Sequence, residues 1–232
     1  MQQKIELSSS STGLGDILLL TSVCKNLLAQ NKKPKVILPE RIARFSILFD
    51  GLADVEIGER EFHTQDIGDG HYSTRKLRNF FEKAELLDNK PLVLHSNQES
   101  EEWVKDFLAD KKNPIIFVPY CAKQWHEVRS FKLDTSIKVI DHLISTGYTP
   151  ILCESSSNPV PISIENKLTD LPLSKYICLL RKVANYYGCN TGDMHLAIAV
   201  NCVCCVIQPK SNPFFNENEW NYSHPSIQYI SV

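Results

Sequence analysis

The sequence has no long apolar run and no excess of charge of either sign. Its longest apolar run near the N-terminus spans residues 17–20, which is far too short to cross a membrane, and no basic segment of the leader type precedes it. The formal net charge is −2 over 232 residues, so there is no general attraction to nucleic acid or anionic lipid. These absences predict a cytoplasmic protein without an integral membrane segment.

Two ligand motifs are also missing. The sequence has no Asp-x-Asp pair of the kind that carries a metal-bound diphosphate. No Gly-Lys-Ser/Thr follows the N-terminal glycines, and Leu18 stands where a dinucleotide fingerprint would have its third glycine. The sequence therefore predicts no bound metal and gives little support for a dinucleotide cofactor.

The chain has eight cysteines, and three of them crowd one apolar stretch. Cys202, Cys204 and Cys205 are interleaved with valines, so we interpret them as small buried apolar side chains in a strand rather than as zinc ligands. Without a secretory leader, a reducing compartment is expected and disulfides are not. The apolar fraction of 43% is ordinary for a globular chain that buries a core.

The sequence does contain a regular alternation of strand and helix patterns. The expected strands are residues 4–7, 35–38, 54–57, 92–94, 115–118, 150–153 and 202–207. The expected helices are residues 17–28, 39–49, 74–87, 99–109, 133–145 and 173–182, and the polar interval 62–72 is expected to be a loop. This pattern predicts an α/β protein of two Rossmann-like, doubly wound domains, residues 1–113 and 114–232, that face each other across a cleft.

The most informative stretch, residues 186–200, reads as a strand, a short polar turn and a helix that opens at Thr191, Gly192 and Asp193. A helix start leaves several backbone N–H groups unpaired at the positive end of the helix dipole, where an anion can bind. His195 would lie on the first turn, within reach of the same ligand. The stretch therefore predicts a phosphate site.

A second glycine-containing turn lies near the N-terminus, where Gly13 and Gly15 lead into an apolar helix. The two glycines let the backbone turn tightly and approach a ligand closely. Asp16 follows at the helix start. Taken alone, it has the ordinary interpretation of a helix cap or a first-turn acid.

Three motifs follow one another along the chain: Gly13-Leu14-Gly15-Asp16, Lys123-Gln124-Trp125 and residues 190–197. In this order they are similar to G-x-G-D, K-x-W and D-[ST]-G-x-x-H-L-A of family 9 of the glycosyltransferases, the heptosyltransferase group. The chain resembles this family in a shortened form, with the closing helices absent or reduced. Asn190 replaces the usual aspartate, so this position keeps a hydrogen-bonding oxygen and loses its charge.

The resemblance implies a GT-B fold, in which the C-terminal domain binds a nucleotide-sugar and the N-terminal domain presents the acceptor. It implies that Asp16 is the general base and that Lys123 binds the diphosphate and assists its departure. It also implies that Glu154 holds the ribose and that Leu173 covers the base. The residues expected at the nucleotide-sugar are Gly13, Gly15, Lys123, Glu154, Leu173, Asn190, Thr191, Gly192, Asp193 and His195.

These residue types suit the transfer of a sugar to a hydroxyl group. A carboxylate near the acceptor can take its proton, and positive charge with N–H donors can stabilise the departing diphosphate without a metal. We therefore expect a metal-independent glycosyltransferase that transfers a hexosyl or heptosyl group. Its co-substrate would be a nucleotide-sugar, with an ADP-linked donor as one option, and its acceptor a hydroxyl-bearing glycan.

Two other functions stay open at this stage. The first is a glycosyltransferase that acts on a modified base in DNA, for which local basic residues are weak support and the net negative charge is weak opposition. The second is a non-catalytic nucleotide-binding module. A salt-dependent affinity for DNA would indicate the first, and diphosphate binding without sugar transfer would indicate the second.

Overall fold

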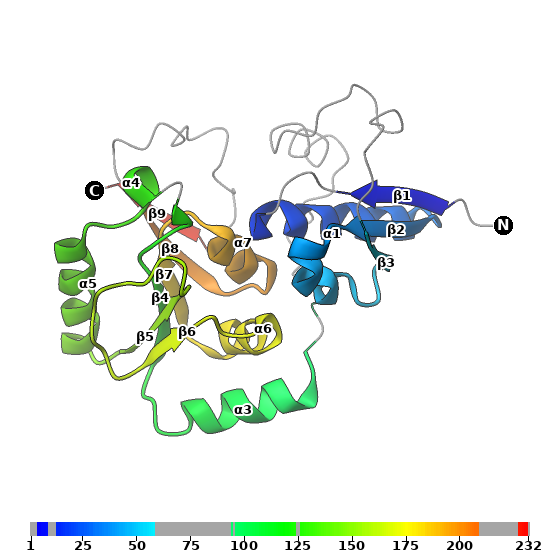
Figure 1. Ribbon diagram of the computed structural model, residues 1–232. Coiled ribbons are helices and arrows are strands. Elements are labelled where there is room, and N and C mark those ends of the chain that lie inside the picture. Colours follow the sequence, from blue (N-terminus) through cyan, green and yellow to red (C-terminus); the bar gives the residue numbers. More distant parts are fainter. Residues whose placement is uncertain are drawn as a thin grey trace. The chain divides into compact units, whose positions relative to one another are not determined.

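The computed structural model describes residues 4–8, 13–58, 94, 96–123, 126–208 and 227–231. The chain divides into two compact units, Met1–His95 and Ser96–Val232 (Figure 1). The loop expected at residues 62–72 and the helix expected at 74–87 lie outside the described residues. The strand expected at 92–94 also lies outside them, apart from Leu94.

The first unit contains a three-stranded parallel sheet in the order β1-β2-β3. Its strands are β1 (Lys4–Ser8), β2 (Lys33–Leu38) and β3 (Asp54–Ile57). Helix α1 (Leu14–Ala29) connects β1 with β2, and the 3₁₀ segment η1 (Glu40–Phe49) connects β2 with β3. The predicted alternation is confirmed here, and the helix expected at 39–49 is a 3₁₀ helix.

Helix α1 begins at the glycine turn that the sequence singles out. Gly13 is its N-cap residue and accepts the first helical hydrogen bond from the amide of Ile17 (3.2 Å). The inward side chains Ile17, Leu20 and Cys24 are buried. Gly13 thus caps the start of the helix with an extended backbone (φ −76°, ψ 135°).

The second unit is built on a six-stranded parallel sheet in the order β6-β5-β4-β7-β8-β9. Its first strand, β4, pairs on one side with β5 and on the other with β7. The strands are β4 (Pro114–Val118), β5 (Thr149–Glu154), β6 (Lys167–Thr169), β7 (Asn185–Gly188), β8 (Val203–Gln208) and β9 (Ile227–Ser231).

Helices cover both faces of this sheet. Figure 1 shows α5 (Leu133–Ser145) on one face and α6 (Leu173–Lys182) and α7 (Gly192–Ala199) on the other. The predicted doubly wound α/β fold is confirmed for this unit. The short helix α4 (His126–Arg129) and the strands β6 and β9 were not predicted from the sequence.

The buried strands explain why the sequence pattern is clear in this unit. Ile115, Ile116 and Phe117 of β4 are fully buried, as a parallel sheet covered on both faces requires. The cysteines expected to be buried in β8 are confirmed: Cys204 and Cys205 are buried and free, and so is Cys202 just before the strand.

Helix α3 (Gln98–Leu108) belongs to the second unit, whereas the sequence places it in the first domain by setting the boundary at 113/114. The helix packs on α6. Trp103 and Phe107 stack with ring centroids 5.0 Å apart, and the ammonium groups of Lys175 and Lys111 lie over these rings at 5.3 and 4.5 Å. The contact between Lys175 and Trp103 joins α3 to α6, and the two units divide before α3.

Gly188 at the end of β7 is held against its neighbours without room for a side chain. A Cβ atom there would lie 2.6 Å from the carbonyl oxygen of Val118 in β4 and 2.6 Å from the Tyr186 hydroxyl. The same carbonyl accepts a hydrogen bond from the amide of Cys189 (3.0 Å). The close approach of β7 to β4 therefore depends on glycine at this position.

We expect Gly188→Ala to lower the free energy of unfolding by about 1–3 kcal/mol, because the added methyl group must displace a backbone carbonyl. The measurement is chemical denaturation followed by circular dichroism. Gly58→Ala is the control, since a Cβ atom there would meet nothing within 4 Å. An equal free energy of unfolding for the Gly188→Ala protein and the parent chain would show that β4 and β7 can move apart to admit the methyl group without loss of stability.

Candidate functional site

Successive strands of the second sheet are added first on one side of β4 and then on the other, so the strand order reverses at β4. From β4 the chain moves outward through β5 to β6, and it then returns to the other side of β4 as β7. Ligands of open α/β sheets bind outside the carboxyl ends of the strands at such a switch point. The two segments at this position are the loop after β4, which contains Lys123, and the turn after β7, which contains Asn190.

Helix α7 begins in the turn after β7, as the sequence predicts. Thr191 is its N-cap residue, and its hydroxyl accepts a hydrogen bond from the amide of Asp193 (3.2 Å). Within the described ranges, the amides of Thr191, Gly192 and Met194 donate to no protein acceptor. Three N–H groups are thus left open at the positive end of the helix.

The rest of the predicted phosphate turn is well anchored. The Tyr186 hydroxyl donates a hydrogen bond to the carbonyl of Cys189 (3.2 Å). Asn190 is buried, and His195 is half-buried on the first turn of α7, where its amide donates to the carbonyl of Thr191 (3.4 Å). The geometry of the open amides is therefore held by the strand and by the cap.

Asp193 places a carboxylate at the same helix start. Its Oδ2 accepts a hydrogen bond from the Thr191 hydroxyl (3.1 Å). Burial raises the pKa of this carboxyl group, and the Thr191 hydroxyl, the backbone and Tyr176 oppose the shift. A carboxyl group whose pKa is raised thus lies at the same helix start as the open amides.

Lys123 lies in the loop after β4 and is exposed. In the part of the chain that the structure describes, it has no ion-pair or hydrogen-bond partner. The other two residues of its motif, Gln124 and Trp125, lie outside the described residues. The structure therefore places Lys123 at the switch point, in the loop of the strand next to the one that leads into α7.

The loop after β4 is tied to the loop after β5 by residues that the sequence motifs do not include. Asn158 donates through Nδ2 to the carbonyl of Cys121 (2.7 Å) and lies 3.3 Å from Nδ1 of His126. Because Nδ2 is the donor in both contacts, His126 accepts at Nδ1 and carries its proton on Nε2. The Tyr120 ring packs edge-on against this imidazole, with centroids 4.5 Å apart. No sequence signal joins residues so far apart in the chain.

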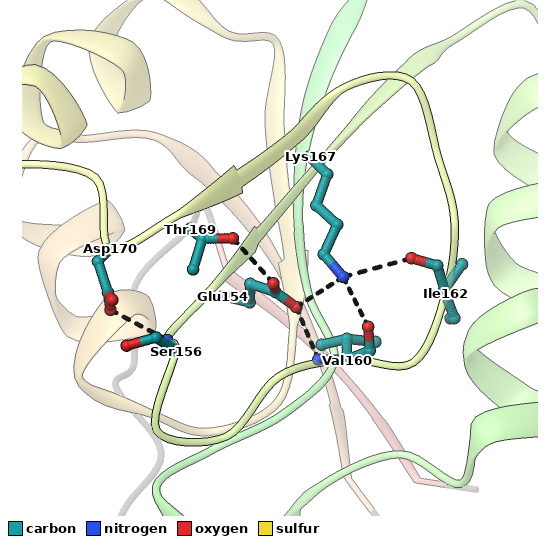
Figure 2. A network of polar contacts seen from close by, with 7 residues as sticks. All are labelled: Glu154, Ser156, Val160, Ile162, Lys167, Thr169 and Asp170. Carbon is teal, nitrogen blue, oxygen red and sulfur yellow. Dashed lines mark hydrogen bonds and ion pairs between the residues drawn. The ribbon is translucent and has the colours of Figure 1, made fainter.

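Glu154, the predicted ribose ligand, lies at the end of β5 inside a network of protein contacts, which Figure 2 shows. Its Oε2 accepts from the amide of Val160 (2.6 Å) and pairs with the Lys167 ammonium (3.1 Å). Its Oε1 accepts from the Thr169 hydroxyl (2.9 Å). With its side chain 4% exposed, Glu154 fixes the loop between β5 and β6, and these contacts compete with the ribose role.

The same network holds the two ends of that loop. The Lys167 ammonium also donates to the carbonyls of Val160 (2.7 Å) and Ile162 (3.4 Å). The Ser156 amide donates to Oδ1 of Asp170 (3.1 Å) (Figure 2). Burial favours the neutral form of Glu154, but its hydrogen bonds and Lys167 together outweigh burial and lower its pKa.

The remaining predicted residues lie on separate elements. Leu173 is half-buried at the first position of α6. In the first unit, Gly13 is the N-cap residue of α1 and Gly15 lies in its first turn. Asp16 is the third residue of this helix, so it is not the cap, and its side chain lies outside what the structure describes. Its role as a base stays a prediction.

The described residues include neither a metal-binding cluster nor a membrane-spanning helix. They contain no group of three or more histidine, cysteine, aspartate or glutamate side chains placed to hold a metal ion. None of the helices in these ranges is long and apolar enough to cross a membrane.

Comparison with solved structures identifies the fold. The chain matches the ADP-heptose lps heptosyltransferase II of E. coli with a TM-score of 0.65 at 14% identity, covering 99% of this chain and 90% of that one. It matches a family 9 glycosyl transferase from Veillonella parvula with a TM-score of 0.69 at 13% identity, covering 99% of this chain and 86% of that one. The fold is that of these glycosyltransferases.

A third match is with a longer protein, of which this chain covers less. The dodecameric iron-containing heptosyltransferase TibC, solved in complex with ADP-D-beta-D-heptose, has a TM-score of 0.64 at 14% identity, with 98% of this chain but 63% of that one covered. No protein-family model matches the chain, and no curated protein matches its sequence. The likeness is thus one of fold at low identity, and it agrees with the GT-B architecture that the motifs imply.

We expect Glu154→Gln to lower the free energy of unfolding by about 1–3 kcal/mol at pH 7, because the change leaves Lys167 and a buried amide without their charged partner. Since the pKa of Glu154 is lowered in the folded chain, its contribution is present above the ordinary glutamate pKa of about 4.3 and is lost as the pH falls further. The difference between the two proteins should therefore shrink in acid.

The measurement is urea denaturation of both proteins across this pH range. Asp54→Asn is the control, because Asp54 pairs with Lys33 at the surface, where both side chains are more than half exposed. That change should alter stability little at any pH. A cost of Glu154→Gln as small as that of the control would mean that the network does not hold the loop.

Proposed function

We propose that the chain transfers a sugar from a nucleotide-sugar to a hydroxyl group. The observation that carries the proposal is the set of open amides at the start of α7, at the switch point of a sheet whose fold is that of heptosyltransferase structures. Amides at a helix start suit a diphosphate, and a diphosphate is the leaving group of a nucleotide-sugar.

On the donor side, the open amides of Thr191, Gly192 and Met194 bind the diphosphate. Lys123 adds a positive charge from the neighbouring loop, and His195 adds a donor from the first turn of α7. Together they stabilise the charge that develops on the diphosphate as its bond to the sugar breaks. The proposed reaction needs no divalent metal, because these groups already compensate the charge of the leaving group.

On the acceptor side, Asp16 takes the proton of the attacking hydroxyl. The acceptor oxygen then forms a bond to the anomeric carbon as the bond from that carbon to the diphosphate breaks. Asp16 is the third residue of α1, and the helix dipole favours a carboxylate in the first turn of any helix. Its position alone therefore does not distinguish a base from a helix-stabilising acid. The rate of sugar transfer, rather than the stability of the fold, is the measurement that tests this role of Asp16.

The donor and acceptor are proposed as classes. TibC was solved with ADP-D-beta-D-heptose, and this supports an ADP-linked sugar as the first donor to test on this chain. A hydroxyl-bearing glycan is the proposed acceptor. The proposed compartment is the reducing cytoplasm that the sequence predicts.

We expect Lys123→Ala to weaken the binding of ADP-sugars by about tenfold to a hundredfold, because a charge-assisted contact with phosphate contributes roughly 1.5–3 kcal/mol. Isothermal titration calorimetry measures the affinity. Lys138→Ala removes an equally exposed cation from α5 and should leave the affinity unchanged. Equal affinities in all three proteins would remove Lys123 from the site.

We expect Asp16→Asn to reduce sugar transfer by ~10²–10⁴-fold while donor binding and stability survive, because asparagine keeps the size of the side chain and loses the proton acceptor. Transfer is followed by mass spectrometry, with and without EDTA. Glu40→Gln is the control, since Glu40 is also an acid in the first turn of a helix in the same unit.

The outcomes separate the enzyme from the binding module. Transfer at a near-normal rate in Asp16→Asn would reject the base, and donor binding without transfer in the parent chain would favour a non-catalytic module. A loss of transfer in EDTA that magnesium restores would reject the metal-free mechanism.

A further inference from the structure

Two cysteines meet beyond the carboxyl ends of the neighbouring strands β4 and β7. Cys121 comes three residues after β4, and Cys189 directly follows β7. The register sets Val118 opposite Gly188, and the amide of Cys189 donates to the carbonyl of Val118 (3.0 Å). Both cysteines pack into one buried cluster of the second unit, and both thiols are free. The fold therefore brings together two thiols that are far apart in the sequence.

The Cys121 side chain is held in place from several sides. Its amide donates to the Ser130 hydroxyl (3.0 Å), and its carbonyl accepts from Nδ2 of Asn158 (2.7 Å). Its sulfur lies 3.4 Å from the Ser130 hydroxyl oxygen and 3.5 Å from the carbonyl oxygen of Ala122. The Cys189 side chain lies within hydrogen-bonding reach of the same sulfur. A thiol fixed beside a second thiol is the arrangement that an internal disulfide needs.

The two thiols differ in access. Cys121 is 7% exposed and is followed by the exposed residues Ala122 and Lys123, whereas Cys189 is fully buried. A small reagent that approaches from solvent along this loop therefore meets Cys121 first.

The thiols also differ in their readiness to ionise. A hydrogen bond from Cys189 lowers the pKa of the Cys121 thiol to about 7; burial opposes this shift, and Ser130 and the Arg129 guanidinium add to it. The thiolate is the attacking species in thiol–disulfide exchange. Burial instead raises the pKa of other thiols in the chain, namely Cys24, Cys153, Cys189, Cys202, Cys204 and Cys205. Access and charge thus agree on Cys121 as the first thiol to react.

We propose that Cys121 is a modification site for low-molecular-weight disulfides and that Cys189 converts the product into an internal disulfide. The Cys121 thiolate attacks one sulfur of the small disulfide, and the first small thiol leaves. The Cys189 thiol then gives up its proton and attacks the Cys121 sulfur, and the second small thiol leaves. The two cysteines lose two electrons and two protons, which the small disulfide gains as it becomes two thiols. An excess of small thiol reverses both steps.

The internal disulfide joins the two segments of the candidate site. Lys123 lies two residues beyond Cys121, and Thr191 lies two residues beyond Cys189. Bond formation draws the segments together and takes the Cys121 sulfur away from Ser130, so Lys123 and the open amides of α7 lose their spacing. The oxidised chain should therefore bind ADP-glucose several-fold more weakly than the reduced chain. This consequence, unlike the disulfide itself, rests on the proposed function.

The experiment incubates the reduced full chain with mixtures of hydroxyethyl disulfide and mercaptoethanol. Remaining thiols are blocked with iodoacetamide, and the products are mapped by mass spectrometry. Trypsin releases Cys121 on residues 113–123, and a second cleavage before Asp193 separates Cys189 from the cysteines at 202–205. We expect a Cys121–Cys189 bridge that disappears as the share of mercaptoethanol rises. Calorimetry then gives the affinity of both forms for ADP-glucose.

Three variants test the order of the two steps. Cys189→Ser should stop at a mixed disulfide on Cys121, because the second attack is lost. Cys121→Ser should form neither the mixed disulfide nor the bridge. Cys205→Ser is the matched control and should keep the bridge, since Cys205 lies in the same cluster and is also 7% exposed.

The parent chain alone can overturn the proposal, so the test does not depend on the folding of a variant. The absence of a bridge at every mixture, or a bridge between other cysteines, would do so. A Cys121–Cys189 bridge that leaves the affinity for ADP-glucose unchanged would overturn its effect on the candidate site. Failure of ADP-glucose to bind either form would reject the proposed function, whereas the mapped disulfide would still stand.

Discussion

The pairing of β4 with β7 is the interaction on which the candidate site depends. The register sets Val118 opposite Gly188, and one further hydrogen bond, from the amide of Cys189 to the carbonyl of Val118, carries the contact past the end of the ladder. Because glycine lets the two backbones approach, the turn into α7 and the loop of Lys123 leave the sheet side by side. The site is therefore a product of backbone geometry before any side chain contributes to it.

Sequence reasoning was strongest where the signal was local. Buried parallel strands such as Ile115–Phe117 read as continuous apolar runs, and the start of α7 carries its own cap residue, Thr191. It was weakest where the deciding contacts are distant in the chain. The three-residue strand β6 has too little pattern to be recognised, and the amphipathic pattern of α3 shows that it packs on something without showing on which sheet.

The site residues follow the same division. The helix start after β7 could be predicted, because an anion site of this kind is encoded in a few adjacent residues. The partners of Glu154 could not be predicted, since Val160, Lys167 and Thr169 meet it only once the loop after β5 has folded back. Similarly, Tyr176 reaches Asp193 from a different helix, and no spacing in the sequence relates the two. Position in a motif therefore indicated where a helix starts with open amides, and it left open which side-chain atoms are already occupied by contacts within the protein.

The packing of α3 has a practical consequence for dividing the chain. A fragment that starts at Pro114 would discard α3, with Trp103 and the buried Val104, and would expose the surface of α6 on which this helix packs. Such a fragment should aggregate, since it presents apolar area to water. A fragment that starts at Ser96 keeps the helix together with its cap residue Asn97, whose side chain accepts from the Ser100 amide (2.8 Å). The second unit can thus be isolated with a self-contained core only if its first helix is retained.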